Sequence, residues 1–141
     1  MNREQFGAYL KRFNSEDATV FDDYLSSRFR MLNGSLAFEG RQGMKAHYCD
    51  RIWPFFVERV NILRFVSDTD HLAIHAWTHF TSKGDFPETL FGPVKEGDAF
   101  DYRGVILYDI EAGQFTNIIV AYNSFSHTPL HKEPLEMGIP H

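Results

Sequence analysis

The stretch VNILRFVSDTDHLAIHAWTHFT, residues 60–81, decides the fold class. Apolar and polar residues alternate on both sides of Asp68-Thr69-Asp70, and this period of two is typical of β-strands. We therefore expect one strand before a turn at 68–70 and a long strand over residues 71–81. Two further strands are predicted downstream, at about residues 99–109 and 115–125.

Upstream of residue 58 the hydrophobic period is helical. Apolar residues at i, i+3, i+4 and i+7 mark one face of a first helix: Phe6, Tyr9, Leu10 and Phe13. A second, short helix is expected near residues 20–25. A third helical run over about 44–56 contains Pro54, which must kink or restart it, because proline lacks an N–H. Asn33-Gly34 predicts a tight hairpin between the second and third helices. Helices followed by antiparallel strands indicate an α+β domain.

Composition narrows the class of partners and the compartment. The chain has 141 residues, enough for one domain with a real core, and 16% of them are aromatic, a residue type that also lines pockets for apolar ligands. A net charge of −5 and the absence of any basic run argue against a nucleic-acid partner. The single cysteine, Cys49, excludes an internal disulfide. With no apolar stretch long enough for a membrane span, we expect a cytoplasmic protein without a membrane partner.

Several short stretches, in this order, carry a resemblance to a known family. They are the opening helix and turn at Phe6–Asp17, the glycine-led Gly40–Met44, the loop Phe91–Asp98 and the hairpin Tyr108–Phe115. Over about residues 3–125 the chain resembles the SnoaL-like (polyketide cyclase-like) family of the nuclear-transport-factor-2-like superfamily. The resemblance implies three N-terminal helices packed in the concave face of a curved, mostly antiparallel sheet, a cone-like α+β barrel around a small apolar pocket. It implies a SnoaL-like domain over residues 1–126, with residues 127–141 as a C-terminal tail packed on it.

The family's catalytic residues transfer only in part. Members include polyketide cyclases, ketosteroid isomerase, limonene epoxide hydrolase and proteins without catalysis, so the fold leaves the function open. Tyr9 resembles the oxyanion-hole tyrosine of ketosteroid isomerase. The isomerase's two acids fall on Asn33 and Gly104, and the cyclase acid falls near Val120. Asn33 cannot serve as a carboxylate base, although a tyrosine and an asparagine at the first two positions resemble the cyclases.

His75, Trp77 and His79 form the most suggestive polar group, because strand alternation puts them on one face. Two imidazoles beside a large ring can move protons on an enolisable ligand. Alternatively, this face is the outer, dimer-forming side of the sheet. The two histidines would lie roughly 13 Å apart at about 3.3 Å per residue, too far to share a metal ion, and we expect no metal site.

These patterns yield a set of candidate residues. Tyr102 lies on a strand face with Phe100, Gly104 and Ile106, which we assign to the cavity. The candidate catalytic residues are Tyr9, Asn33, His75 and Tyr102. The candidate ligand-binding residues are Phe13, Tyr48, Trp53, Trp77, His79, Phe100 and Tyr122.

The first functional hypothesis is a cofactor-independent cyclase or isomerase that acts by proton transfer on a small apolar ligand bearing a carbonyl. The alternative is a non-catalytic ligand-binding or dimeric module of the same fold, favoured by the missing carboxylates. Both hypotheses imply a homodimer through the outer face of the sheet.

Overall fold

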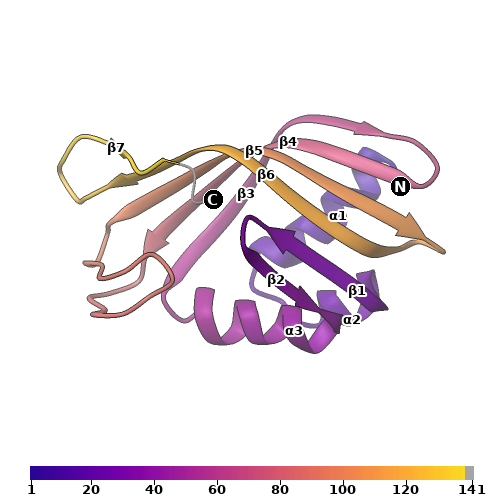
Figure 1. Cartoon of the computed structure of the whole chain (residues 1–141), viewed down its shortest axis with the longest axis horizontal. Helices are drawn as coiled ribbons and strands as arrows, with labels where there is room; N and C mark the ends of the chain where they lie inside the picture. The colour runs from indigo at the N-terminus through magenta and orange to yellow at the C-terminus, as the bar shows by residue number, and fades with distance from the viewer. Residues whose placement is uncertain (139–141) are drawn as a thin grey trace.

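The structure is a computed structural model and describes residues 1–138. The helices are α1 (Arg3–Asn14), α2 (Val20–Tyr24) and α3 (Gly40–Ala46), and a π-helical segment, η1 (His47–Ile52), continues α3. The strands are β1 (Leu25–Asn33), β2 (Leu36–Glu39), β3 (Phe56–Ser67), β4 (His71–Ser82), β5 (Ala99–Glu111), β6 (Gln114–Thr128) and β7 (Leu135–Glu136). The long strands arch over the helices (Figure 1).

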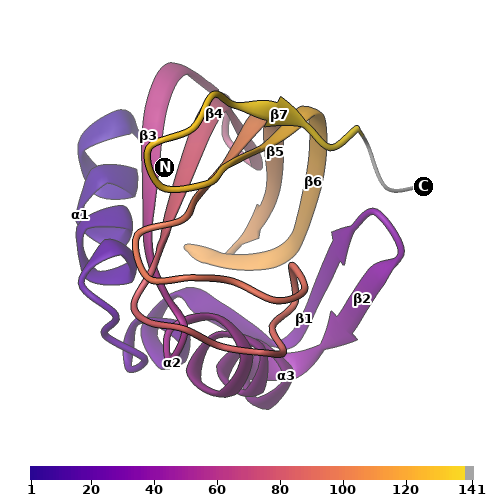
Figure 2. The ribbon, with the colours of Figure 1, turned by 90° about the vertical axis from the view of Figure 1, so that its left-hand side faces the viewer.

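The sheet is curved and does not close on itself. Its strand order is β2-β1-β6-β5-β4-β3, and β7 pairs with β6. The β1–β6 pair is parallel and the other pairs are antiparallel. Viewed end-on, the strands curve from β3 round to β6 while α2 and α3 cover the open side (Figure 2). The predicted α+β class, with helices in the concave face of a mostly antiparallel sheet, is confirmed.

Helix α1 is fastened to the edge strand β3. Asn2 and Gln5 form a capping box at its start, which satisfies two backbone N–H groups. At its end, the Asn14 side chain donates to the carbonyl of Val60 (3.0 Å) and accepts from the Val60 N–H (2.9 Å). An edge strand otherwise leaves such groups unpaired. The contact therefore fixes the buried face of α1 against the first half of β3.

Two boundaries differ from the sequence-based expectation. The third helical run ends at Ile52, with Trp53 N donating to Tyr48 O at 2.8 Å, because Pro54 has no N–H to continue the pattern. Phe56, expected on this helix, begins β3 instead. The tight hairpin exists, but the residues between its strands are Gly34 and Ser35 rather than Asn33 and Gly34. Gly34 has a φ of 59°, a conformation that glycine adopts without strain.

The end of the chain folds back on the sheet. Strand β6 continues to Thr128, and β7 returns antiparallel to it, with Ser126 opposite Glu136. The carboxylate of Asp98 accepts from the Leu130 N–H at 3.1 Å, which holds the connecting segment down. The last three residues of the predicted tail, 139–141, lie outside the described residues. Within residues 1–138, no helix combines the length and hydropathy that a membrane crossing requires.

Gly104 occupies the closest approach between β5 and β6. The strand register shifts there, with Arg103 opposite Ser124 and Gly104 opposite Tyr122. A Cβ atom on Gly104 would lie 2.3 Å from the Tyr122 Cα and 2.4 Å from the Ala121 carbonyl oxygen. Because these are backbone atoms, no side-chain movement can relieve the clash. The sheet bends at a position that only glycine fits.

Replacing Gly104 with alanine tests this bend. We expect Gly104→Ala to lower the free energy of unfolding by about 3 kcal/mol, because the new methyl group forces the strands apart. Gly7→Ala is the matched control, since nothing lies within 4 Å of a Cβ at that helical position. Alanine there should stabilise α1 by about 0.5–1 kcal/mol. Urea denaturation of both variants gives the comparison, and equal effects would contradict the close approach.

Candidate functional site

A cavity of about 410 Å³ lies between the concave face of the sheet and the helices. Its walls come from α1, η1, the β1–β2 hairpin, strands β3–β6 and the loop after β4. Aromatic and aliphatic side chains form most of the lining. The volume falls within the roughly 300–1,000 Å³ typical of small-molecule sites.

Six of the sequence-predicted site residues meet in this cavity. They come from five separate elements and are Tyr9, Phe13, Asn33, Tyr48, Tyr102 and Tyr122. Trp53 and Phe100 are buried beside the cavity and do not line it. Trp53 packs against Phe13 and Tyr48, which do line it. Phe100 stacks on His127 with ring centroids 4.3 Å apart.

The side chains of His75, Trp77 and His79 on β4 point away from the cavity. On β4 the buried residues are Leu72, Ile74, Ala76, Thr78 and Phe80, so His75, Trp77 and His79 lie on the outer face of the sheet. Trp77 Nε1 donates to Asp101 at 2.6 Å, and His79 Nδ1 lies 2.7 Å from the same carboxylate oxygen. The placement of these three residues beside a ligand is corrected, because strand alternation turns them away from the cavity.

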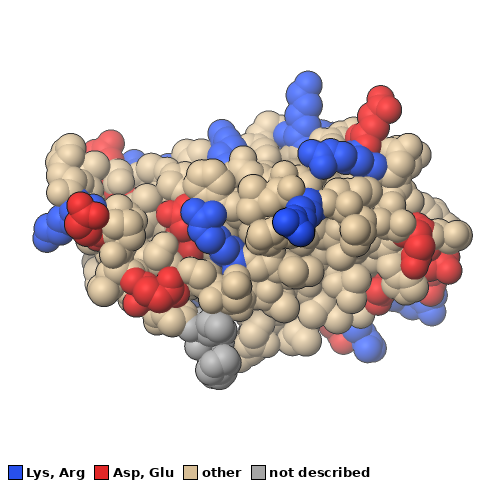
Figure 3. All heavy atoms as spheres, turned by 90° about the horizontal axis from the view of Figure 1, so that it is seen from above, with Lys and Arg blue, Asp and Glu red and all other residues tan. Residues whose placement is uncertain are grey.

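The outer face of the sheet remains the predicted dimer surface. Seen from above, most of it is formed by uncharged residues, with separate Lys and Arg side chains over the middle and Asp and Glu side chains mainly toward the two ends (Figure 3). Val105 and Leu107 on β5 are exposed there, at 46% and 38%. The Arg103 guanidinium lies 4.9 Å from the centroid of the Trp77 ring. Dimerisation through this face stays a prediction.

The residue that sequence reasoning missed is Glu58. It follows two residues after Phe56 on β3, is only 5% exposed and lines the cavity. Among residues 1–138, no hydrogen-bond partner reaches its Oε2 atom. Burial, with a smaller contribution from the negative charge of Glu16, raises the pKa of Glu58 to about 8. The sequence itself contains a signal for its burial, because alternation with a period of two places Glu58 on the apolar strand face between Phe56 and Val60.

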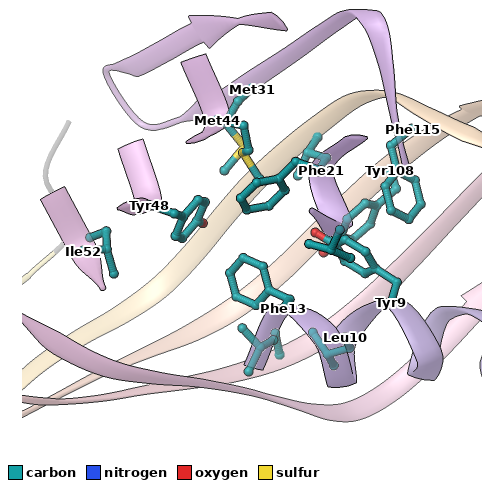
Figure 4. Packing of buried hydrophobic residues seen from close by; sticks show 14 of the residues in the cluster. Tyr9, Leu10, Phe13, Phe21, Met31, Met44, Tyr48, Ile52, Tyr108 and Phe115 are labelled. Atoms are coloured by element: carbon teal, nitrogen blue, oxygen red, sulfur yellow. The ribbon is translucent and has the colours of Figure 1, made fainter. Parts of the chain in front are cut away.

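Several tyrosines line the same cavity as this carboxyl group. Burial raises the pKa values of four tyrosine hydroxyl groups above the usual range for tyrosine, and the negative charge of Glu58 raises each of them further. These residues are Tyr9, Tyr48, Tyr102 and Tyr108. Figure 4 shows the hydroxyls of Tyr9, Tyr48 and Tyr108 directed into the interior. Because these phenols stay protonated at neutral pH, each can donate a hydrogen bond to a ligand oxygen.

His47 is a second polar group that is not among the candidate site residues predicted from the sequence. It is 8% exposed and lines the cavity from η1. Burial, with a smaller contribution from the Arg51 guanidinium, lowers the pKa of His47 to about 4, so the imidazole is neutral at pH 7. Within residues 1–138, no three His, Cys, Asp or Glu side chains gather to hold a metal ion.

The family model for the SnoaL-like domain matches residues 6–118. The chain belongs to the SnoaL-like family. No curated protein matches the chain.

Solved structures of low sequence identity share the fold. A candidate polyketide cyclase from Xanthomonas campestris pv. campestris is 20% identical, with 85% of this chain and 88% of that chain covered and a TM-score of 0.70. The Δ5-3-ketosteroid isomerase from Mycobacterium sp. is 18% identical, with coverage of 89% and 96% and a TM-score of 0.69. A computationally designed 17-OHP binder is 14% identical, with coverage of 84% and 90% and a TM-score of 0.68.

The buried Glu58 makes stability depend on pH in a stated direction. In the folded state Glu58 keeps its proton up to about pH 8, whereas the usual pKa of a glutamate side chain is 4.5. Between these values the unfolded state binds fewer protons, so the free energy of unfolding falls as pH rises, by at most about 1.4 kcal/mol per pH unit. Glutamine carries no titratable proton, so Glu58→Gln does not lose this part of the free energy of unfolding as pH rises.

Thermal unfolding at several pH values measures the effect. The melting temperature of Glu58→Gln relative to wild type should rise steadily from pH 5 to pH 8. Glu88→Gln is the matched control, because Glu88 is exposed, and its difference from wild type should stay constant over the same range. A constant difference for Glu58→Gln as well would mean that Glu58 is not held protonated.

Proposed function

We propose that this SnoaL-like protein binds a small apolar ligand bearing a carbonyl group and moves a proton on it as a cofactor-independent isomerase or cyclase. One observation carries the proposal: the Glu58 carboxyl group is buried in the cavity wall, and its Oε2 atom has no partner among residues 1–138. Buried polar groups are normally hydrogen-bonded, and carboxyl groups with strongly shifted pKa values are common at functional sites. Glu58 takes the role of proton carrier that the sequence had assigned to His75.

The chemistry follows from the groups around Glu58. When ionised, its carboxylate removes a proton from the carbon beside the ligand carbonyl, and the electron pair of that C–H bond moves into an enolate. Tyrosine hydroxyls, among them those of the sequence-predicted Tyr9 and Tyr102, donate hydrogen bonds to the enolate oxygen. Glu58 then returns the proton to another carbon, so the reaction is an isomerisation that gains and loses no atoms.

The comparisons suggest which carbonyl compounds to try first. One protein of this fold is a Δ5-3-ketosteroid isomerase, and another was designed to bind 17-OHP. Steroid ketones are apolar, and the cavity of about 410 Å³ accepts ligands of this class. They are the probes we choose, and the natural ligand shares their chemistry: an apolar skeleton with a carbonyl.

The proposal is tested by adding androst-5-ene-3,17-dione and following the ultraviolet absorbance of the conjugated enone that isomerisation produces. We expect Glu58→Gln to lower the rate by about 100-fold or more, because the proton carrier is lost. Its affinity for the steroid should stay within a few-fold, since glutamine fills the same space. The wild-type rate should increase with pH and level off above about 8, where Glu58 is ionised.

The matched control for this assay is Glu88→Gln, which removes an exposed carboxylate and should keep the wild-type rate. A Glu58→Gln variant that binds and turns over the steroid like wild type would contradict the role of Glu58.

The alternative function is a non-catalytic ligand-binding module of the same fold. It is favoured by the pKa of Glu58, because a carboxyl group with a value of about 8 is mostly protonated at pH 7 and donates a hydrogen bond. Asn33, Gly104 and Val120 also supply no carboxylate. The two functions separate in D2O: a catalyst exchanges the protons beside the carbonyl of the bound ketone for deuterium, and a binding module leaves them in place.

A further inference from the structure

The cavity has polar groups at two separate positions. Glu58 lies on β3, and His47 packs against Phe38 of β2 with ring centroids 5.1 Å apart. Strands β2 and β3 are the two edges of the unclosed sheet. The charged neighbour of Glu58 is Glu16, whereas that of His47 is Arg51. Glu58 and His47 therefore reach the cavity from different elements, β3 and η1.

Packing alone fixes the ring of His47. Its imidazole stacks on Phe38 at an interplanar angle of 29° and meets the ring of Tyr48 edge-on, at 4.8 Å and 87°. Within residues 1–138, the imidazoles with hydrogen bonds are those of His71, His79 and His127. His47, which is 8% exposed, has none among these residues. Because its ring lines the cavity, a ligand there can supply a hydrogen-bond partner.

The protonation state of His47 narrows what that partner is. A neutral imidazole has one donor and one acceptor nitrogen, so it pairs with a hydroxyl or a carbonyl group. Burial opposes the imidazolium form, which would be needed to balance the charge of a carboxylate. The ring therefore suits an uncharged oxygen function.

We propose that His47 determines specificity by hydrogen bonding to a second, uncharged oxygen group of the ligand, separate from the group that meets Glu58. The ligand class is accordingly an apolar skeleton with two separated hydroxyl or carbonyl groups. This inference rests on the proposed function, and it adds a feature of the substrate that Glu58 and the tyrosines do not define.

A pair of steroids that differ in one oxygen tests the inference. Androst-4-ene-3,17-dione carries two carbonyl groups, and androst-4-en-3-one lacks the second. Titration calorimetry with wild type should show about fivefold to tenfold tighter binding of the dione, the effect of one added hydrogen bond. His47→Phe keeps the ring and its stacking, so the monoketone affinity should stay within about twofold while the preference for the dione disappears.

The control for this variant is His75→Phe, the same substitution at an exposed position on the outer face of the sheet. It should keep the wild-type preference. A dione preference that survives in His47→Phe would overturn the inference and leave the proposed function intact. Failure of wild type to bind either ketone would overturn the proposed function together with the inference.

Nitrogen NMR of the histidine rings gives an answer that does not depend on the variant folding. Adding the dione to wild-type protein labelled with 15N-histidine should shift the His47 ring nitrogens, and the monoketone should leave them nearly unchanged. A bound dione with an unshifted His47 signal would contradict the hydrogen bond. Tighter binding of the matching 17-carboxylate than of the dione would contradict the uncharged class.

Discussion

A carboxyl group held in an apolar cavity without a counter-charge is the constraint on which this site depends. Burial disfavours the carboxylate, so Glu58 keeps its proton well above the usual pH range. The same burial keeps Tyr9, Tyr48 and Tyr108 protonated. A group of hydrogen-bond donors thus faces the cavity at neutral pH, with one member that can still give up its proton near neutrality.

The fold positions these groups through a few backbone features. Asn14 hydrogen-bonds both backbone groups of Val60, which sets α1, with Tyr9, against the strand that carries Glu58. The close approach at Gly104 bends β5 against β6. Next to that bend, the rings of Tyr102 and Tyr122 stack nearly parallel with their centroids 4.7 Å apart, and both residues line the cavity. The polar groups are therefore held by elements far apart in sequence.

The fold could be predicted because it follows from local periodicity. The spacing of apolar residues in the sequence predicts both the buried face of α1 and the inward face of β5 at Tyr102. The site was harder, because alternation shows that two strand faces differ without showing which of them is concave. His75 was therefore placed with the ligand although it faces outward. Glu58 was missed because a single acid in an apolar strand is also typical of an exposed edge strand. Its burial becomes evident only when β3 is seen packed against α1. The place of His47 in the cavity lining is evident only once α3 and η1 are seen against the sheet.

The most direct test of this site is the pKa of Glu58 itself. Carbon-detected NMR of the side-chain carboxyl groups, with the Glu58 signal assigned by its loss in Glu58→Gln, follows its titration without any ligand. We expect the Glu58 carboxyl carbon to titrate near pH 8. A Glu58 signal that titrates near 4.5, the usual value for a glutamate side chain, would contradict a buried acid in the cavity.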